Sequence, residues 1–364
     1  MLRVDVDVVV IGSGPGAGAA LSQLSATSAR VAVLEAAELP RPKACGGLTL
    51  CSALRDFQWL LSDVYQRRIV RRSYRFRGGD LHGEERQDTP LSLVDRAEFD
   101  AALVLNALCA SHGSIRLYEG CRVVRVEEFE DSVEVTIEGG TVFRGDYLIA
   151  ADGVASLTAR CLSMPPRGVA GPSVEADIVV SSEAFAGFSE SVFFDYFCLP
   201  QGYGWIFPKQ DRTLNVGVVS WDRKAKVALH FAQFVDSYLN EADVISKHQI
   251  AFPIPAFRGE GAVATRRVCL VGDAASLVDP VSGEGIRYAL ISGALAGKTI
   301  AGVLDASFGG AVHRMGCLAY ERDVRCQVEP QLLPILRFAS LPFNEAPEHY
   351  YRRFVLGGRS KAYS

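Results

Sequence analysis

The hydrophobic pattern of the first 35 residues predicts a strand, a helix and a second strand. Val8–Ile11 is an uninterrupted run of apolar, β-branched residues, and Val31–Leu34 is a second apolar run. The stretch between them is rich in Ala and Leu, which are strong helix formers. Short, fully apolar strands on either side of a helix are typical of a parallel sheet that is covered on both faces.

Strands and helices continue to alternate as far as about residue 164. Leu91–Asp95 is predicted to form a short strand, and Arg96–His112 an amphipathic helix. Two hairpin-like strands follow at Arg122–Phe129 and Ser132–Ile137, and Thr141–Ala150 is predicted to be one further strand segment. This order of elements indicates an α/β domain.

The pattern changes between residues 165 and 260. Period-two alternation dominates in three segments, Glu175–Val180, Val192–Phe197 and Thr213–Val219. The only clear helical pattern in this region is Ala225–Tyr238. We therefore predict an antiparallel sheet domain inserted into the α/β chain. The α/β character returns at residues 267–275, before a long helix that ends at about Leu304.

Length and composition limit the class of protein. At 364 residues the chain is long for one core, so two joined domains are expected, and its net charge of −4 gives no argument for nucleic-acid binding. The nine cysteines lack a Cys-x-x-Cys pair, which argues against a disulfide framework or zinc site and favours a reducing compartment. We expect no membrane-spanning helix, because no apolar run reaches about 18 residues, and no signal peptide, because the first strand begins so early.

The turn after the first strand carries a nucleotide-binding motif. GSGPGA, residues 12–17, has the G-x-G-x-x-[G/A] spacing. Gly12 permits the tight turn, Gly14 lets backbone N–H groups approach a pyrophosphate, and Ala17 lets the helix pack closely on the strand. Glu35 follows the second strand, where a carboxylate accepts hydrogen bonds from a ribose hydroxyl. Together these features predict dinucleotide binding without identifying the dinucleotide.

Three later segments are candidates for the same site, and each also has a plainer explanation. In RPKACGGLTL, Arg41–Leu50, the paired glycines permit unusual backbone shapes, although Cys45 is equally explained as a small buried thiol in a turn. ADGVAS, Ala151–Ser156, is either a nucleotide-facing loop or a helix cap. Asp273 lies at the end of a strand, before the Gly-rich start of a helix. Its carboxylate could accept hydrogen bonds from the hydroxyls of a ribitol chain. The helix N-terminus could stabilise negative charge on a reduced ring.

Two segments of the sheet region carry unusual side chains. In GYGWIFP, Gly202–Pro208, the alternating Tyr203, Trp205 and Phe207 are expected to share one face, either as core or as the wall of an apolar substrate pocket. QRRIVRRSYRFR, Gln66–Arg77, contains six arginines. It is interpreted either as a solvated sheet face or as a site for phosphate or an anionic lipid surface.

Taken together, these motifs resemble those of the FAD-dependent oxidoreductases of the geranylgeranyl reductase family, relatives of the aromatic hydroxylases. The similarity covers roughly Asp5–Leu304 and weakens in the tail. GSGPGA with Glu35 resembles the family's ADP-binding motif, ADGVAS its Asp-Gly motif, and VGDAASLVDPVSGEGI its Gly-Asp motif for ribitol and pyrophosphate. KACGG resembles the reductase segment whose cysteine lies near the isoalloxazine, and GYGWIFP resembles the segment that lines the isoprenoid pocket. The K-x-G-E-S lysine of the halogenase relatives is absent.

The resemblance implies an α/β fold with a Rossmann-like FAD-binding domain, an inserted antiparallel β-sheet substrate domain and a short helical C-terminal tail. The expected FAD-binding domain is discontinuous, with residues 1–66, 96–164 and 261–326. Residues 67–95 and 165–260 are assigned to the substrate-binding sheet domain, and residues 327–364 to the C-terminal helical segment.

The resemblance also implies the site residues. Contacts with non-covalent FAD are expected from Gly12, Gly14, Pro15, Gly16, Ala17, Glu35, Ala36, Lys43, Cys45, Gly46, Gly47, Arg96, Asp152, Gly153, Gly272, Asp273, Pro280, Gly283, Gly285 and Ile286. Substrate contacts are expected from Tyr203, Trp205, Phe207 and Pro208. No metal is expected. Cys45 is the expected catalytic residue, either as an acid or as a shaping group, since a thiol with a pKa of about 8.5 is a poor acid for an alkene.

The implied activity is reduction of C=C bonds in an isoprenoid, geranylgeranyl-type chain carried by a lipid, quinone or pyrophosphate. NADPH or ferredoxin is the expected electron donor, and in the second case ferredoxin would be a redox partner protein. No nucleic-acid partner is expected. The alternatives are an FAD monooxygenase acting on a small apolar metabolite and a flavoprotein without turnover. A cytoplasmic location is expected, with peripheral contact at the inner face of the membrane as an alternative interpretation of the apolar and basic tail.

Overall fold

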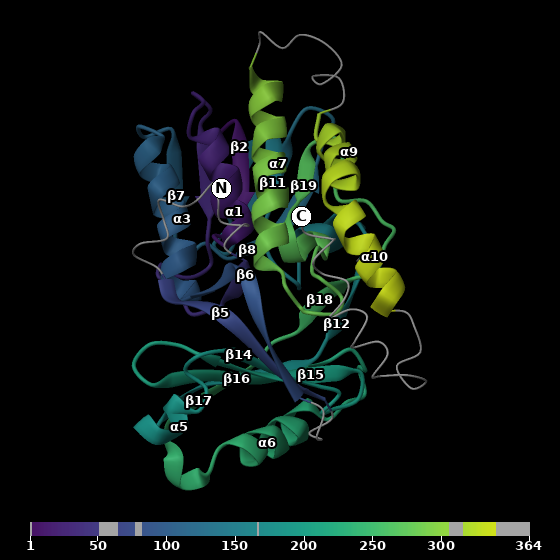
Figure 1. Ribbon diagram of the computed structural model, residues 1–364. Coiled ribbons are helices and arrows are strands. Elements are labelled where there is room, and N and C mark those ends of the chain that lie inside the picture. The colour runs from purple at the N-terminus through teal and green to yellow at the C-terminus, as the bar shows by residue number, and fades with distance from the viewer. Residues whose placement is uncertain (1, 51–64, 77–81, 166, 306–315, 340–364) are drawn as a thin grey trace.

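The structure, a computed structural model, describes residues 2–50, 65–76, 82–165, 167–305 and 316–339. Figure 1 shows two main layers of β-structure, with α1, α3 and α7 beside the upper one and α6 beneath the lower one. The upper layer contains a parallel sheet and the lower layer a mostly antiparallel one. The predicted α/β fold class with an antiparallel sheet region and short C-terminal helices is confirmed.

The parallel sheet contains the predicted strand–helix–strand unit. Its strand order is β19-β11-β2-β3-β7, and every neighbouring pair runs parallel. The strands are β2 (Val8–Ile11), β3 (Val31–Leu34), β7 (Ile115–Tyr118), β11 (Tyr147–Ala150) and β19 (Val268–Leu270). Helix α1 (Pro15–Leu24) follows β2, and α7 (Ile286–Leu304) packs on α1. Because these strands are parallel, their carboxyl ends meet at one edge of the sheet.

A four-stranded sheet lies against this unit, in the order β1-β10-β9-β8. Its strands are β1 (Arg3–Asp5), β8 (Val123–Glu128), β9 (Val133–Ile137) and β10 (Val142–Gly145). The segment 141–150, predicted as one strand, is divided between β10 here and β11 in the parallel sheet. The chain crosses between the sheets at Asp146 and Tyr147, whose N–H groups both donate to the Asp7 carbonyl, at 3.0 and 3.2 Å.

The lower layer is an eight-stranded sheet in the order β17-β13-β16-β15-β14-β5-β6-β4. Its strands are β4 (Leu48–Leu50), β5 (Tyr65–Phe76), β6 (His82–Val94), β13 (Ser173–Val180), β14 (Val192–Tyr196), β15 (Gly202–Pro208), β16 (Thr213–Ser220) and β17 (Val244–Ala251). Neighbouring strands are antiparallel except β14 and β5. The pair β12 (Gly168–Gly171) and β18 (Ile254–Phe257) joins the two layers in Figure 1. The domain bounds stay a prediction, although β4 precedes residue 67 and already pairs in this sheet.

The two faces of the eight-stranded sheet pack against different partners. Helix α6 (Val227–Tyr238) covers one face, where Phe231 and Phe234 join an aliphatic core. The opposite face carries an aromatic cluster that includes Phe194 and Trp205. Because Figure 1 places α6 on the side away from the parallel sheet, the aromatic face is directed toward that sheet.

The remaining helices are α3 (Arg96–Ala110), α4 (Leu157–Cys161), α5 (Ser182–Ala186), α9 (Leu318–Gln327) and α10 (Glu329–Ala339), with one-turn helices η2 (Glu241–Asp243) and η3 (Gly272–Ala275). Alternation alone did not predict α5, whose first turn is capped by the Ser181 hydroxyl. Helices α9 and α10 run back beside α7, as expected of the tail, and residues 340–364 lie outside the described residues. Among the described helices, none has the length and apolarity needed to cross a membrane.

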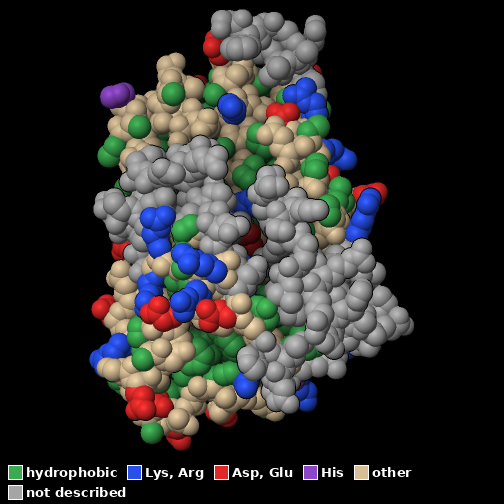
Figure 2. All heavy atoms as spheres, viewed as in Figure 1, with side chains coloured by type: hydrophobic (Ala, Val, Ile, Leu, Met, Phe, Trp, Pro, Cys, Tyr) green, Lys and Arg blue, Asp and Glu red, His purple; other side chains and the backbone are tan. Residues whose placement is uncertain are grey.

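Figure 2 shows the side chains over the region of β5 and β6. Lys and Arg side chains lie there beside Asp and Glu side chains rather than forming a field of one sign. Arg71 and Glu84, both about half exposed, form an ion pair of 3.5 Å, whereas Arg72 is buried. Mixed, solvated charges favour the interpretation of a solvated sheet face, and an anionic partner for this strand stays a prediction.

Glycines allow α1 and α7 to approach closely. A Cβ added to Gly293 would lie 2.0 Å from the Gly16 carbonyl oxygen, and one added to Gly297 would lie 2.4 Å from the Ala20 carbonyl oxygen. A Cβ at Gly302, near the end of the same helix, would meet no atom within 4 Å. The contact between the helices therefore depends on missing side chains in α7, and it holds the first turn of α1 in place.

We predict that Gly293→Ala lowers the free energy of unfolding by about 1–3 kcal/mol, because the two backbones must separate to admit the methyl group. Gly302→Ala is the control on the same helix and should be neutral or raise stability by up to about 1 kcal/mol, since Ala is the better helix former. Urea unfolding of both variants beside the wild type measures the difference. An unchanged unfolding midpoint in Gly293→Ala would contradict the close contact.

Candidate functional site

The glycine turn after β2 leaves an open space in front of a helix N-terminus. Gly12 has a φ of +92°, and a Cβ there would lie 2.5 Å from the Ala151 carbonyl oxygen, so glycine is required for the backbone. Gly14 has an ordinary φ of −75°, yet its absent Cβ would meet nothing within 4 Å. No side chain caps the first turn of α1, which begins with Pro15. The uncapped N–H groups and the empty space above Gly14 fit a phosphate group.

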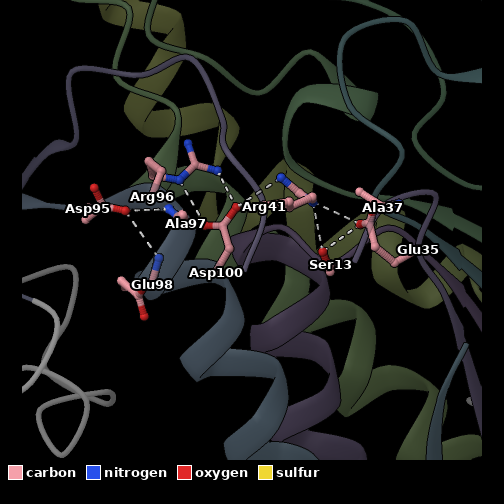
Figure 3. A network of polar contacts seen from close by, with 9 residues as sticks. All are labelled: Ser13, Glu35, Ala37, Arg41, Asp95, Arg96, Ala97, Glu98 and Asp100. Atoms are coloured by element: carbon pink, nitrogen blue, oxygen red, sulfur yellow. Dashed lines mark hydrogen bonds and ion pairs between the residues drawn. The ribbon is translucent and has the colours of Figure 1, made fainter. Parts of the chain in front are cut away.

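Glu35, at the end of β3, is held in a polar network that Figure 3 shows. The Ser13 hydroxyl donates to its Oε2 at 2.6 Å, the Ala37 N–H donates to its Oε1 at 3.0 Å, and Arg41 pairs with it at 3.1 Å. Burial raises the pKa of the Glu35 carboxyl, but these contacts prevail and leave it below its ordinary value. Glu35 is therefore an ionised acceptor at neutral pH, as a ribose-binding carboxylate must be.

The same network extends to the start of α3. Arg96 donates to both carboxylate oxygens of Asp100, one turn further along the helix, at 2.9 Å each, and Arg41 lies 3.7 Å from the same carboxylate. Asp95 caps the helix by accepting from the Ala97 N–H. The buried Arg96 guanidinium also interacts with the Cys45 thiol. Arg96 therefore links the first turn of α3 to the KACGG segment.

The fold places Lys43 and Cys45 near Asp273 of the predicted Gly-Asp motif. Burial lowers the pKa of Lys43 to about 8; the charges of Arg96 and Arg41 act in the same direction, and those of Asp273 and Cys45 oppose them. The Lys43 ammonium lies 3.3 Å from the centroid of the Phe252 ring. The KACGG segment thus lies beside Asp273, although the two are 230 residues apart in sequence.

Two further loops complete the edge. Asp152 accepts at 3.0 Å from both the N–H and the hydroxyl of Thr158 in the first turn of α4, while the Ser156 hydroxyl caps that helix by accepting from the Ala159 N–H. The other Asp152 oxygen, Oδ1, is buried without a partner in the described part of the structure. Helix α7 begins after Gly285 with no side-chain cap, and a Cβ on Gly285 would lie 3.3 Å from Asp273.

These donors and acceptors fit a dinucleotide that carries phosphates, a ribose and a polyhydroxylated chain. The residues present would hold it with the α1 and α7 N-termini, the Glu35 carboxylate and Asp273. Of the other predicted cofactor residues, Ala36 is exposed beside Glu35, Gly153 follows Asp152, and Pro280, Gly283 and Ile286 lie in or after the loop before α7. In the described residues no cluster of His, Cys, Asp and Glu is arranged to hold a metal ion.

The aromatic face of the sheet meets this edge at two points. A Cβ on Gly46 would lie 2.8 Å from the Phe207 ring, so the cysteine segment packs directly on β15. The Tyr203 hydroxyl donates to the carbonyl of Ser282, in the loop before α7. Tyr203, Trp205 and Phe207 form one stripe, with successive ring centroids 5.9 and 6.2 Å apart. The predicted common face is observed, and Pro208 ends the strand that carries it.

Sequence reasoning missed several polar residues of the site. Ser13 and Arg41 lie within the noted motifs but were not assigned roles, and the spacing of Asp100 four residues after Arg96 could have suggested their pairing. Glu175 and Asn215 lie on the aromatic face of the sheet. The hairpin of β15 and β16 could have suggested the place of Asn215, whereas no local signal marks Glu175, because β13 pairs with a strand that is distant in sequence.

Comparison with known proteins supports a flavin cofactor. A family model described as an FAD binding domain matches residues 5–313. The menaquinone reductase of Mycolicibacterium smegmatis is 30% identical over 83% of this chain and 78% of its own length. The digeranylgeranylglycerophospholipid reductase of Methanothrix thermoacetophila is 28% identical over 76% of this chain and 70% of its own length. The chain is thus an FAD-dependent oxidoreductase.

We predict that Gly14→Val folds normally but is isolated without FAD, because the new side chain would enter the space expected for the pyrophosphate, where its Cβ meets no described atom within 4 Å. Absorbance of the flavin and release of FAD on acid denaturation measure cofactor content. Gly12→Val is the contrasting variant and should lose about 1–3 kcal/mol or more of stability, through overlap with Ala151 and a φ that valine disfavours. Full FAD content in Gly14→Val would contradict the assignment of this space.

Solved structures show the same fold. A geranylgeranyl bacteriochlorophyll reductase-like protein of Thermoplasma acidophilum superposes with a TM-score of 0.78 over 93% of this chain and 87% of its own, at 19% identity. This likeness includes both layers, since the aligned region spans nearly the whole chain. The FAD-domain match, the reductase relatives and the arrangement of the site agree. The chain belongs to the FAD-dependent geranylgeranyl reductase family.

Proposed function

We propose that this protein reduces C=C bonds in an isoprenoid chain attached to a lipid, quinone or pyrophosphate carrier. The observation that carries the proposal is the contact between the Cys45–Gly47 turn and the aromatic stripe of β15, at the edge where the nucleotide motifs meet. An apolar face beside a flavin suits a hydrocarbon chain and limits access of water. The printed names of the relatives, a menaquinone reductase and a digeranylgeranylglycerophospholipid reductase, favour the same substrate class.

The chain's own residues have distinct tasks in this reaction. Reduced FAD, when bound, supplies a hydride, so the protein has to orient the alkene and provide a proton to its second carbon. Trp205 and Tyr203 present ring faces that stabilise positive charge on a developing tertiary carbon. Cys45 lies between Arg96 and the aromatic stripe, where its thiol would contact either the flavin ring or the substrate when these are bound. NADPH or a ferredoxin is the proposed electron donor, and a membrane-bound prenyl lipid would bring the protein to the inner face of the membrane.

An anaerobic experiment tests the proposal. The FAD-loaded protein is reduced without oxygen, mixed with geranylgeranyl pyrophosphate, menaquinone or a geranylgeranyl phospholipid, and followed by flavin absorbance. Reoxidation with a product that is 2 Da heavier per reduced bond supports the reductase. Products that form only after air is admitted would identify a monooxygenase instead, since the FAD motifs serve both activities.

We predict that Cys45→Ala keeps FAD but loses most of its alkene reduction, because the thiol lies at the contact of the two motifs. Cys198→Ala is the matched control, since this partly buried thiol packs on the opposite face of the sheet. Flavin absorbance confirms loading, and the rate of anaerobic reoxidation by the accepted substrate gives the comparison. Full turnover in Cys45→Ala would make this cysteine structural.

We predict that Trp205→Ala changes how many double bonds are reduced more than it changes FAD content. Removal of a buried indole costs about 3–5 kcal/mol of stability, so only folded, FAD-loaded protein is compared. Trp205→Phe keeps an aromatic ring but removes the N–H, and it should preserve most of the product pattern. Mass spectrometry of the products counts the reduced bonds. An identical pattern in Trp205→Ala would place the stripe in the core, away from substrate.

A further inference from the structure

A buried carboxyl lies on the aromatic face beside the cysteine turn. Glu175 of β13 is paired in register with Gly217 of β16, and Gly217 is paired in turn with Trp205 of β15. A Cβ on Gly217 would lie 2.2 Å from the indole, so the Trp205 ring lies over Gly217 of β16, in the row that joins β15 to β13. Glu175 itself is only 9% exposed. An acid in this place is enclosed by the substrate-facing side of the sheet.

Asn215 connects this carboxyl to the aromatic stripe. Its Oδ1 accepts from the indole N–H of Trp205 at 2.7 Å, and its Nδ2 donates to Asp177 at 2.9 Å. Because the indole nitrogen can only donate, the amide orientation is fixed, with its N–H groups directed at the carboxylates. The same side-chain amide lowers the pKa of Glu175, which lies two residues from Asp177 on the same face of β13. Trp205 and Asn215 are therefore joined by a hydrogen bond, and the amide side of Asn215 faces the carboxylates of β13.

The cysteine turn lies on this group of residues. The backbone N–H of Cys45 lowers the pKa of the Glu175 carboxyl, as a donor near a carboxylate does. A Cβ on the next residue, Gly46, would lie 3.2 Å from the Asn215 Oδ1, so the turn lies directly on this network. The Cys45 thiol accepts from the Gly47 N–H at 3.3 Å, which closes the turn on itself. Movement of Glu175 or Asn215 would thus be passed to Cys45.

We propose that Glu175 and Asn215 are positioning residues of the alkene-reducing site. They hold the Cys45 turn at a fixed position relative to the Trp205 indole. The inference rests on the proposed function and deepens it, because it links two motifs through residues in neither of them. A purely structural filler here would be better apolar, since a buried acid is costly unless its hydrogen bonds are used. In its ionised form the carboxylate attracts the Cys45 N–H strongly, and on protonation that attraction weakens.

The proposal gives alkene reduction a pH step set by Glu175. Burial raises the pKa of this carboxyl to about 7, while Lys209 lowers it and Asp177 raises it. The Cys45 N–H and Asn215 lower it as well. The other charged or ionisable groups nearby are the Cys45 thiol, Arg96, Lys43, whose burial lowers its pKa to about 8, and His248 of β17, which is paired with Asp177. Reduction should therefore be faster above pH 7 than below it.

The test compares FAD-loaded variants over pH 5.5–9 with geranylgeranyl pyrophosphate as the probe, under anaerobic conditions. The wild-type reoxidation rate should fall roughly tenfold as pH drops through 7, the order expected when a reacting group is misplaced by a fraction of an ångström. Glu175→Gln keeps an acceptor oxygen but cannot ionise, so its step near pH 7 should vanish. A step that persists in Glu175→Gln at the wild-type midpoint would overturn the proposal.

Neighbouring charges supply matched controls on the same face. Asp177→Asn removes the adjacent carboxylate of β13, which does not contact Cys45, so the step should persist and move to lower pH. Lys209→Gln should move it to higher pH. Shifts in these opposite directions are not expected from a general loss of folding, and midpoints that move in the wrong sense would contradict Glu175 as the titrating group.

Stability gives a second readout of the same titration. An acid whose folded-state pKa is raised makes the unfolded state the weaker proton binder, so wild-type stability falls as pH rises from about 5 to 7 and then levels off. Glu175→Gln should lack this fall. Urea unfolding at pH 5, 6, 7 and 8 measures it. Parallel pH profiles for wild type and Glu175→Gln would contradict a raised pKa at this position.

Hydrogen exchange separates the inference from the proposed function. If the wild type reduces no prenyl probe, the proposed function fails, and amide exchange of the peptide covering residues 43–47 still decides the positioning role. Exchange should be several-fold faster at pH 8 in Glu175→Leu than in wild type, and unchanged in Asp177→Asn. Should Glu175→Leu not fold, Glu175→Gln is compared instead. Equal exchange in the Glu175 variant and the wild type would overturn the inference.

Discussion

The close approach of the Cys45–Gly47 turn to the sheet is the constraint on which the rest of the site depends. Any side chain on Gly46 would lie within 2.8 Å of the Phe207 ring, and one on Gly47 would lie 2.1 Å from the Val94 carbonyl oxygen. The Val94 N–H donates back to the Gly47 carbonyl at 3.0 Å. The turn is therefore held between two strands of the eight-stranded sheet, β15 and β6, while its preceding residues reach the edge with the nucleotide-binding motifs.

Buried charges around this turn are arranged so that each cation faces an anion or an aromatic ring. Arg96 and Asp100 share a two-pronged ion pair in which the carboxylate is completely buried. Such a pair repays its desolvation only with good geometry, and removing one partner leaves a costly uncompensated charge. Lys43 depends instead on the Phe252 ring and on Asp273. The cations and carboxylates at the site are thus matched in number, which allows them to be buried together.

The sequence allowed the local parts of the site to be predicted, but not the contacts across it. The apolar run before Gly12, the glycine spacing and the acid at position 35 are short-range signals, and they predicted the strand, turn and helix at the nucleotide edge. Alternation predicted that Tyr203, Trp205 and Phe207 share a face. It could not show that α6 covers the opposite face. Asn215 lies in the hairpin of β15 and β16, but the role of Glu175 depends on the pairing of β16 with β13, which lies about thirty residues earlier and for which a single sequence holds no local signal.

The two faces of the eight-stranded sheet explain how one domain can be both stable and reactive. The face under α6 is an ordinary core of aliphatic side chains closed by aromatic residues of the helix. The other face has a row of aromatic rings beside a row of polar groups, and it is closed by loops of the cofactor domain, through Gly46 and through the Tyr203 hydroxyl. Both faces bury apolar side chains, but only the second also keeps a buried carboxyl, that of Glu175, close to the Cys45 turn. A hydrocarbon chain lying on this face would meet apolar rings along its length and polar groups only at the Cys45 turn, which confines chemistry to one point along the chain.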